Sequence, residues 1–379
     1  MIKLRLWVFI PVLFLVVSCA SGPSNLIGVK LLEPSRVTSD GATIQNLFIA
    51  TSRRRSDDAS EFFSGEREQA LNLANVDVSI PNSHVPGRLE QRRFGEAEDV
   101  SKHFTIARPS VFANSPDFVT KLNNSLSAKA PGDREVLVFV HGYNTNFSSA
   151  VLRVSQFVKD TDFKGVPLLF TWASRGRALD YVYDINSALQ ARFYLLELAE
   201  ILAGTDAESF SIVAHSMGNL VTLEAMTQLI KQGFRPKAEL NRVILAAPDV
   251  DLDLFDQYAS DLAPVRKNIV VLVSKDDRAL KLSRRIAGGV DRVGAADPDA
   301  IAKYGLDVID LTQIDDDSNI HHTKFEQSPE IVKLIGRGIA DGNTLSTTAT
   351  DGLENGIGSV FRGFRQVASG VGTVITLGN

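Results

Sequence analysis

The sequence predicts an α/β fold, with a mostly parallel central sheet covered by helices on both faces. Strand-length apolar runs, such as residues 136–140 and 243–246, alternate with segments of helical periodicity, such as residues 187–202. Strands that are apolar throughout have both faces buried, which is typical of parallel strands joined by crossover helices. A serine at position 216 follows one such strand, and the carboxyl ends of parallel strands are where these folds place their sites.

The first 18 residues have the pattern of a signal peptide. Lys3 and Arg5 precede an apolar run over residues 6–17, which is too short to span a bilayer. The run ends in Val-Val-Ser-Cys, which resembles the lipobox of bacterial lipoproteins, where the cysteine is diacylated and becomes the new N-terminus. Cys19 is therefore the expected lipidation site, with an ordinary secretory signal or an uncleaved anchor as the alternatives.

The expected lipid anchor, an acyl group such as palmitate on Cys19, has two consequences. Ala20 rather than Asp follows the cysteine, and the resemblance then implies a bacterial cell-envelope protein held at the outer membrane and facing the periplasm. Because Cys19 is the only cysteine, no thiol is left for a disulfide, a thiol nucleophile or a Cys-ligated zinc. Residues 19–43, which carry Ser, Gly, Pro and Thr without periodicity, are expected to be a tether.

Composition argues against nucleic acid as a partner. The formal net charge is −5, with 40 basic and 45 acidic residues, and the basic residues are dispersed along the chain. The one basic run, Arg53 to Arg55, is expected to be a solvated loop.

The remaining elements divide the chain into three parts. Strand-like runs at residues 44–50, 76–80 and 103–106 predict a small β-rich extension over residues 44–130, ahead of an α/β domain over residues 131–340. Residues 341–379 are expected to be a loosely ordered Gly-, Ser- and Thr-rich tail, with a short helix over residues 360–367 as the alternative. In the α/β domain, strands are expected at residues 136–140, 166–170, 210–213, 243–246, 269–273 and 308–311, and helices at residues 148–159, 187–202, 219–232 and 329–340.

Residues 214–218, Ala-His-Ser-Met-Gly, have the form of a nucleophile elbow. They lie between a predicted strand and a predicted helix, and such a turn forces its central residue, Ser216, into a strained backbone conformation. The residues two positions away must then be small, and here they are Ala214 and Gly218. The alternative is a chance pentapeptide in a tight turn.

A serine hydroxyl needs a base to become a nucleophile. Of the six histidines, only His321 and His322 follow the last strand of the α/β domain, where the base belongs in the chain order Ser, Asp, His. Adjacent residues on a loop point in different directions, so only one of the two can serve.

The base in turn needs an acid to orient it, and two strand ends supply candidates. Asp276 and Asp277 follow the strand at residues 269–273, and Asp249 follows the strand before it. The usual placement after the later strand favours Asp276 or Asp277. A helix start follows Asp277, and Asp276 is available to cap it.

Two backbone N–H groups are expected to stabilise the oxyanion. Met217, directly after the serine, supplies one at a helix N-terminus, and Tyr143, after the first strand of the α/β domain, supplies the other. Gly142 lets this backbone approach the substrate closely. The aromatic side chains of Tyr143, Phe147 and Trp172 either line the pocket or pack in the core. Asp184 is expected to cap the helix that follows it.

Together these residues resemble the α/β-hydrolase superfamily and, more narrowly, a largely uncharacterised bacterial family of esterase-like α/β hydrolases. That family's pattern implies His322 as the base, because it places a histidine before Ser/Thr-x-aromatic, and Asp277 as the acid. Ala173 and Ala214 depart from the family and superfamily patterns, and neither is a catalytic group. The resemblance lies in residues 78–87, 139–147, 170–174, 183–184, 214–219, 247–251, 274–280 and 322–325.

The sequence thus predicts a serine hydrolase that cleaves a carboxylic ester of a small molecule or a lipid. An acyltransferase with the same triad is the nearest alternative, and a non-catalytic envelope scaffold is the alternative from another class. No cofactor is expected. No metal site is expected either, because the histidines lack helical ligand spacing.

Overall fold

The computed structural model describes residues 42–58, 60–92, 96, 99–316, 319–340, 363–369 and 372–378. The predicted signal peptide, Cys19 and most of the predicted tether lie outside these residues, as do residues 341–362 of the predicted tail. Within the described ranges, no helix combines the length and the apolar character needed to cross a membrane.

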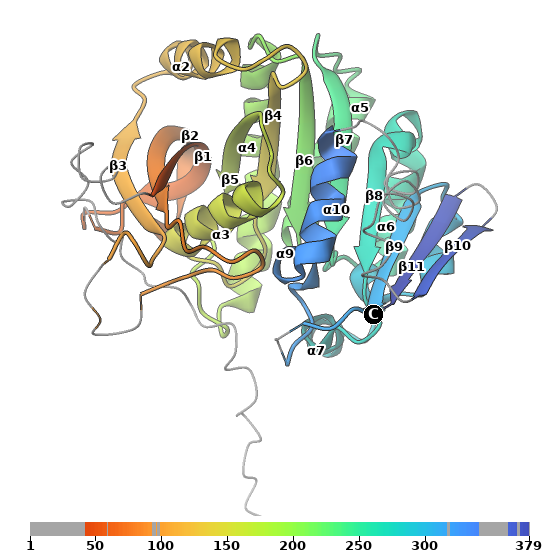
Figure 1. Cartoon of the computed structure of the whole chain (residues 1–379). Coiled ribbons are helices and arrows are strands. Elements are labelled where there is room, and N and C mark those ends of the chain that lie inside the picture. Colours follow the sequence, from red (N-terminus) through yellow and green to blue (C-terminus); the bar gives the residue numbers. More distant parts are fainter. Residues whose placement is uncertain are drawn as a thin grey trace, which may run out of the picture.

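One sheet of eleven strands runs through the molecule (Figure 1), in the order β10-β11-β9-β8-β7-β6-β4-β5-β1-β2-β3. The pairings from β11 through β9 and on to β1 are all parallel, and antiparallel partners complete both edges of the sheet. The strands are β1 (Thr43–Arg55), β2 (Phe63–Ile80), β3 (Thr105–Val111), β4 (Glu135–Val140), β5 (Val166–Thr171), β6 (Ser209–His215), β7 (Glu239–Ala246), β8 (Ile269–Val273), β9 (Asp307–Gln313), β10 (Gly363–Ser369) and β11 (Gly372–Gly378).

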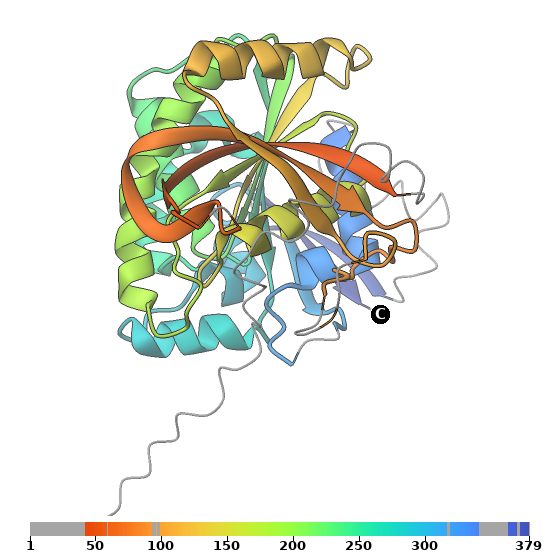
Figure 2. The ribbon, with the colours of Figure 1, turned by 90° about the vertical axis from the view of Figure 1, so that its left-hand side faces the viewer.

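Helices cover both faces of this sheet, as the apolar strands predict (Figure 2). Residues of α4 and α5 belong to the apolar cluster on one face, and residues of α3 and α10 belong to the cluster on the other. The helices are α2 (Ser115–Ser127), α3 (Phe147–Asp160), α4 (Tyr181–Ala203), α5 (Gly218–Lys231), α6 (Leu252–Asp261), α7 (Arg278–Ile286), α8 (Pro298–Ala302), α9 (Lys324–Gln327) and α10 (Pro329–Ala340), with short 3-10 turns η1 (Ala263–Asn268) and η2 (Val293–Ala295).

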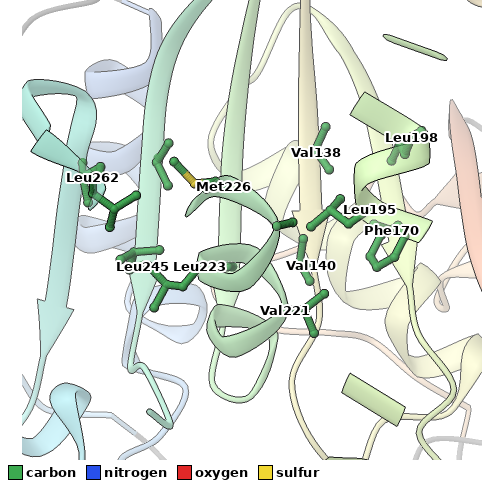
Figure 3. Packing of buried hydrophobic residues seen from close by; sticks show 14 of the residues in the cluster. Val138, Val140, Phe170, Leu195, Leu198, Val221, Leu223, Met226, Leu245 and Leu262 are labelled. Atoms are coloured by element: carbon green, nitrogen blue, oxygen red, sulfur yellow. The ribbon is translucent and has the colours of Figure 1, made fainter. Parts of the chain in front are cut away.

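The central strand β4 shows how the two faces are divided. Val136, Val138 and Val140 join the cluster under α4 and α5, part of which Figure 3 shows, whereas Leu137 and Phe139 join the cluster under α3 and α10. Successive side chains of a strand point to opposite faces, so a strand buried on both is expected to be apolar along its length, and in β4 only the first residue, Glu135, is polar. The mostly parallel α/β architecture predicted from the sequence is confirmed.

The strands predicted as an N-terminal extension continue this same sheet. β1 pairs in parallel with β5, with Phe48 opposite Leu168, and β2 pairs with β1. The basic run at residues 53–55 was expected to be a solvated loop, and that prediction is wrong. It is the end of β1, and Arg53 is fully buried. The predicted extension also contains α2, whose buried Phe118 and Leu122 follow the helical period.

The C-terminal segment also differs from the prediction. Residues 363–369 and 372–378 form β10 and β11 rather than a loose tail or a helix over residues 360–367. β11 lies parallel to β9, with Val374 opposite Val308, and Val374 and Ile375 are buried. The β-branched run Thr-Val-Ile at residues 373–375 favours a strand, and burial against the sheet decides for it.

A buried ion cluster fixes the loop after β2 to the end of α3. His84 lies 2.7 Å from Glu90 through Nδ1 and 2.6 Å from Asp160 through Nε2, and its side chain is 4% exposed. The backbone N–H of Gly87 also donates to Asp160 at 2.9 Å. Burial by itself lowers the pKa of His84, but its hydrogen bonds to the two carboxylates outweigh burial and raise it.

Candidate active site

Ser216 stands at the tip of a sharp turn between β6 and α5, so the strand, turn and helix lie where the sequence predicts them. Its φ of +53° is in the left-handed region, which is unfavourable for a residue with a side chain. The turn packs tightly against the end of β4. A Cβ atom at Gly218 would lie 2.4 Å from the carbonyl oxygen of His141, so position 218 requires glycine.

Hydrogen bonds hold this strained backbone in place. The Ser216 carbonyl oxygen accepts from the backbone N–H of Asn219 at 3.1 Å, from Asn219 Nδ2 at 2.9 Å and from the backbone N–H of Asp249 at 3.2 Å. The Ser216 N–H donates to the carbonyl oxygen of Ala246 at 3.0 Å. The turn is therefore fixed by the ends of the neighbouring strands and not by its own residues alone.

His322 and Asp277 form a buried pair across two loops. His322 Nδ1 lies 2.6 Å from Asp277 Oδ2, and the Asp277 side chain is fully buried. The other oxygen, Oδ1, accepts from the backbone N–H of Leu280 and caps α7, so one carboxylate both starts a helix and holds a histidine. Burial lowers the pKa of His322, but the charge of Asp277 and its hydrogen bond outweigh burial and raise it.

His322 is brought to the elbow through His215, the residue before the serine. The two imidazole rings have their centroids 4.8 Å apart, and His215 Nε2 lies 3.3 Å from the His322 carbonyl oxygen, to which it donates. Burial lowers the pKa of His215 far below its ordinary value, so this ring is neutral. The hydrogen bonds found among the described residues do not include one from Ser216 Oγ to His322, a contact that often tightens only when substrate binds.

The other two candidates from these loops make different contacts. His321 Nδ1 bonds to Asp316. Asp276 lies 2.9 Å from the ammonium group of Lys324 and accepts from Ser274 Oγ. The expected cap at Asp276 is wrong, since Asp277 itself caps α7.

Asp249, the third candidate acid, is buried beside the elbow, where its charge interacts with that of His322 while its side-chain hydrogen bonds go to other groups. Its Oδ1 accepts from Ser283 Oγ at 2.6 Å, and Tyr181 OH lies 3.5 Å from Oδ2. Arg292 Nε is 3.3 Å away, as an ion pair that lacks hydrogen-bond geometry. Burial raises the pKa of Asp249 against the opposing charge of Arg292.

The loop after β4 places backbone N–H groups beside the serine. A Cβ atom at Gly142 would lie 2.8 Å from Ser216 Cβ, so only glycine allows these backbones to approach so closely. Tyr143 follows directly. Met217 precedes α5 as its N-cap, where the first N–H groups have no acceptor within the helix. Both expected oxyanion donors thus belong to backbone adjoining the serine side chain.

Arg53, from β1, lies beneath this loop and was missed by sequence reasoning. Its guanidinium donates to Thr145 O at 2.6 Å, Ser174 O at 2.7 Å and Thr171 Oγ1 at 2.8 Å. It also lies 3.4 Å from His141 Nε2. Burial lowers the pKa of Arg53 to about 10, which leaves it charged near neutral pH. A fixed, buried cation therefore holds the carbonyl side of the loop.

Asp184 holds the amide side of the same loop. The prediction that it caps a following helix is wrong, because Asp180 is the N-cap of α4. Asp184 Oδ2 accepts from the backbone N–H of Asn144 at 3.2 Å and from Ser174 Oγ at 2.5 Å. Asn144 has a φ of +55°, so the loop is strained where the carboxylate binds it. Burial raises the pKa of Asp184, and the charge of Arg53 opposes this.

The aromatic side chains near the loop divide between packing and lining. Trp172 and Phe147 are buried, at 0% and 1% exposure, and pack in the interior. Trp172 stacks on His141 with ring centroids 5.0 Å apart and donates through Nε1 to the His141 carbonyl oxygen at 2.8 Å. Burial lowers the pKa of His141 to about 3, so this histidine is a neutral packing group. Tyr143 is only partly buried, with its OH bonded to the carbonyl oxygen of Ala178.

The described residues include no group of three or more His, Cys, Asp or Glu side chains arranged to hold a metal ion.

A mostly parallel sheet with helices on both faces, and a strained serine between the central strand β6 and its helix, define the α/β-hydrolase fold. A family model described as "Alpha/beta hydrolase of unknown function (DUF900)" matches residues 115–338, more than half of the chain. The protein belongs to this family.

Individual relatives are distant. An uncharacterized protein of Nostoc sp., alr1448, is 26% identical over 137 residues, which are 29% of this chain and 35% of that protein, so the chain spans about a third of this curated relative. A solved phospholipase, PlaB from Legionella pneumophila in complex with thio-NAD, is 13% identical with a TM-score of 0.34, over 65% of this chain and 67% of its own. A Pyrobaculum calidifontis esterase is 11% identical with a TM-score of 0.36, over 81% of this chain and 88% of its own.

Proposed function

We propose that the protein is a serine hydrolase that cleaves carboxylic esters through an acyl-enzyme on Ser216, with His322 as the base and Asp277 as the acid. The observation that carries this proposal is the strained serine beside a buried histidine–carboxylate pair. A left-handed φ at a non-glycine residue is retained where function requires it. A histidine whose Nδ1 is bound to a carboxylate presents Nε2 as a base.

The proposed reaction has two halves. Ser216 Oγ attacks the acyl carbon while His322 Nε2 takes the hydroxyl proton, and the N–H groups of Tyr143 and Met217 stabilise the resulting oxyanion. The C–O bond to the alcohol then breaks, and His322 donates the proton to the leaving oxygen. Water repeats the sequence on the acyl-enzyme and releases the acid. Asp277 stays ionised throughout and orients the imidazole.

The two neighbouring histidines make a sharp test, because they differ in their partners. We expect a fluorophosphonate probe to label the wild-type protein, and Ser216→Ala to abolish labelling. On p-nitrophenyl esters of increasing chain length, Ser216→Ala and His322→Ala should lose roughly 10⁴- to 10⁶-fold in kcat. His321→Ala is the matched control and should retain most of the activity. No labelling of the wild type, or an equal loss in His321→Ala, would overturn the assignment.

We further propose that Cys19 is lipidated and tethers the protein to the cell envelope, at the outer membrane and facing the periplasm. The support is the sequence alone, in the apolar run followed by the lipobox-like Val-Val-Ser-Cys. Mass spectrometry of the mature N-terminus should find a diacylated Cys19. Fractionation should find the protein with the outer membrane, and Cys19→Ala should release it. An unmodified N-terminus elsewhere in the chain would refute this anchor.

A further inference from the structure

An exposed surface beside the candidate active site combines cations with protruding apolar side chains. We define it as the rim surface, formed by the start of α4 and by α7. Its apolar members, Leu179, Val182 and Ile286, are 87%, 70% and 57% exposed. Only two further large apolar side chains of the described residues are exposed in this way, Val85 and Phe193. The concentration of three on one edge sets this surface apart, since single exposed apolar residues are ordinary.

The cations of the rim surface come mainly from α7. This helix has four basic residues and no acidic residue among its nine, in a chain whose net charge is −5. Arg278, Lys281, Arg284 and Arg285 are all exposed, while Leu280 faces the interior. The charge is therefore a local feature and opposes the charge of the whole molecule.

Few carboxylates neutralise this charge. Arg284 pairs with Asp291 at 3.0 Å, and near the start of α4 Asp180 pairs with Arg175 at 3.7 Å. The acidic groups closest along the chain, Asp276 and Asp277, are engaged with Lys324 and His322. Within the described ranges, the ion pairs include none made by Arg278, Lys281 or Arg285, nor by the exposed Arg177 before α4.

The two parts of the rim surface are joined to each other and to the site. Tyr181 OH lies 2.9 Å from Ser283 Oγ, which links the first residue of α4 to α7. Asp277, the proposed acid, caps α7, and Tyr143 bonds to Ala178 just before α4. Figure 1 shows α7 beyond the tips of the parallel strands, at the edge opposite α2. The rim surface is therefore joined to the loops that carry the candidate site residues.

Cations together with apolar side chains at the same edge fit an anionic lipid bilayer. Basic residues are attracted to anionic headgroups, and exposed apolar side chains enter the acyl boundary. We propose that the rim surface docks the protein onto anionic membrane lipid, so that the active site faces the bilayer and esters of membrane lipids are its substrates. The docking stands without any catalysis, whereas the substrate class rests on the function proposed above.

Tryptophan insertion tests the docking on the full chain, whatever anchors its N-terminus. Leu179→Trp places a reporter on the rim surface. Phe193→Trp is the matched control, because it lies on α4 about 16 Å beyond Val182 at 1.5 Å per residue. With brominated lipid in vesicles containing phosphatidylglycerol, we expect added quenching over wild type for Leu179→Trp alone, and less in pure phosphatidylcholine. Equal quenching of both reporters, or none for Leu179→Trp, overturns the proposal.

Charge reversal tests the electrostatic part. Lys281→Glu should raise the lipid concentration needed for half-maximal quenching of the Leu179→Trp reporter at least about tenfold. The reason is that the substitution changes the charge near the membrane by two units. Lys121→Glu, exposed on α2 at the far edge, should leave it unchanged. An equal effect of both reversals would overturn the rim surface as the docking site.

Kinetics separate this proposal from the proposed function. Val182→Ser and Lys281→Glu should lower hydrolysis of lipid esters in anionic vesicles several-fold, with kcat on a soluble short-chain ester unchanged. Equal losses on both substrates would count against docking. No hydrolysis by the wild type of any ester would sink the function and the substrate class, while insertion of Leu179→Trp would still show docking.

Discussion

Arg53 and Asp184, two buried opposite charges that attract each other without a direct ion pair, give a quantitative test of how the loop beside the serine is held. Arg53→Met keeps the length of the side chain and removes its guanidinium. The carbonyl oxygens of Thr145 and Ser174 then lose donors at 2.6 and 2.7 Å, and Asp184 loses an opposing buried charge. A buried acceptor left without its donor costs about 1–3 kcal/mol, so the loss of both donors gives an expected cost of about 2–6 kcal/mol for Arg53→Met.

The pair should also show coupling. Asp184→Asn keeps an acceptor for the Asn144 N–H and removes the charge, so we expect a smaller cost of about 1–3 kcal/mol. In the double variant, the Asp184→Asn change removes the buried carboxylate that Arg53→Met alone would leave without an opposing charge. The double variant should therefore be at least about 1 kcal/mol more stable than the sum of the single costs predicts. Costs that add within about 0.5 kcal/mol would refute this electrostatic coupling.

Urea unfolding of the full chain, followed by circular dichroism, measures these free energies, and ester hydrolysis reports on the loop. Arg54→Met is the matched control. Arg54 is exposed, so its replacement should change the free energy of unfolding by less than about 0.5 kcal/mol. Arg53→Met should in addition lower kcat under conditions where the variant remains folded, because the loop carrying Tyr143 loses its support. Normal kcat in folded Arg53→Met would show that the loop is held by other contacts.

Three further outcomes follow from the structure. Gly218→Ala should abolish ester hydrolysis and lower the melting temperature, because the added Cβ would meet the His141 carbonyl oxygen at 2.4 Å; unaltered kinetics would contradict this contact. The raised pKa of His84 means that its ion cluster stabilises the fold fully below the ordinary value of 6.5, and this stability is lost as pH rises through the raised value. The free energy of unfolding of His84→Gln should therefore fall furthest below that of the wild type in mild acid and least in base. A difference that grows with pH would contradict this. The proposed base, His322, must be neutral to act, and its pKa is raised. The acid limb of the pH profile of kcat/KM should therefore have its midpoint above pH 6.5, and Asp277→Asn should move that midpoint to lower pH.

The parallel strands were predictable because their burial leaves a direct trace in the sequence. β4, β5 and β8 are covered on both faces, so each is an apolar run apart from Glu135 at the start of β4 and Thr171 at the end of β5. β1 and β2 extend well beyond the predicted runs because their outer halves mix polar and apolar residues, and pairing with neighbouring strands holds them. α2 was not separated from loops because only a few buried residues anchor it, whereas the helix start expected after Asp277 is the start of α7.

In the candidate site, the parts that follow chain order could be predicted and the parts that depend on tertiary contacts could not. Ser216 is marked by a local turn, and a glycine at 218 is required by that turn. Whether His321 or His322 meets Asp277 depends on how the loop after β9 folds, which its sequence does not determine by itself. Arg53 was interpreted as solvated because isolated charges usually are, and only the pairing of β1 with β5 places it under the loop.

These contacts make the N-terminal strands part of the candidate site. The family model begins at residue 115, so it includes the elbow and the His322–Asp277 pair but not Arg53. The loop at residues 142–146 is polar apart from Tyr143, which packs against the apolar cluster, and Asn144 has a left-handed φ. Packing alone does not hold such a loop, so fixed hydrogen bonds must, and preorganised donors stabilise an oxyanion only when their backbone is fixed beforehand. β1 supplies the Arg53 side of that support and α4 the Asp184 side, so a chain reduced to the matched region would keep the reacting groups and lose half of what positions them.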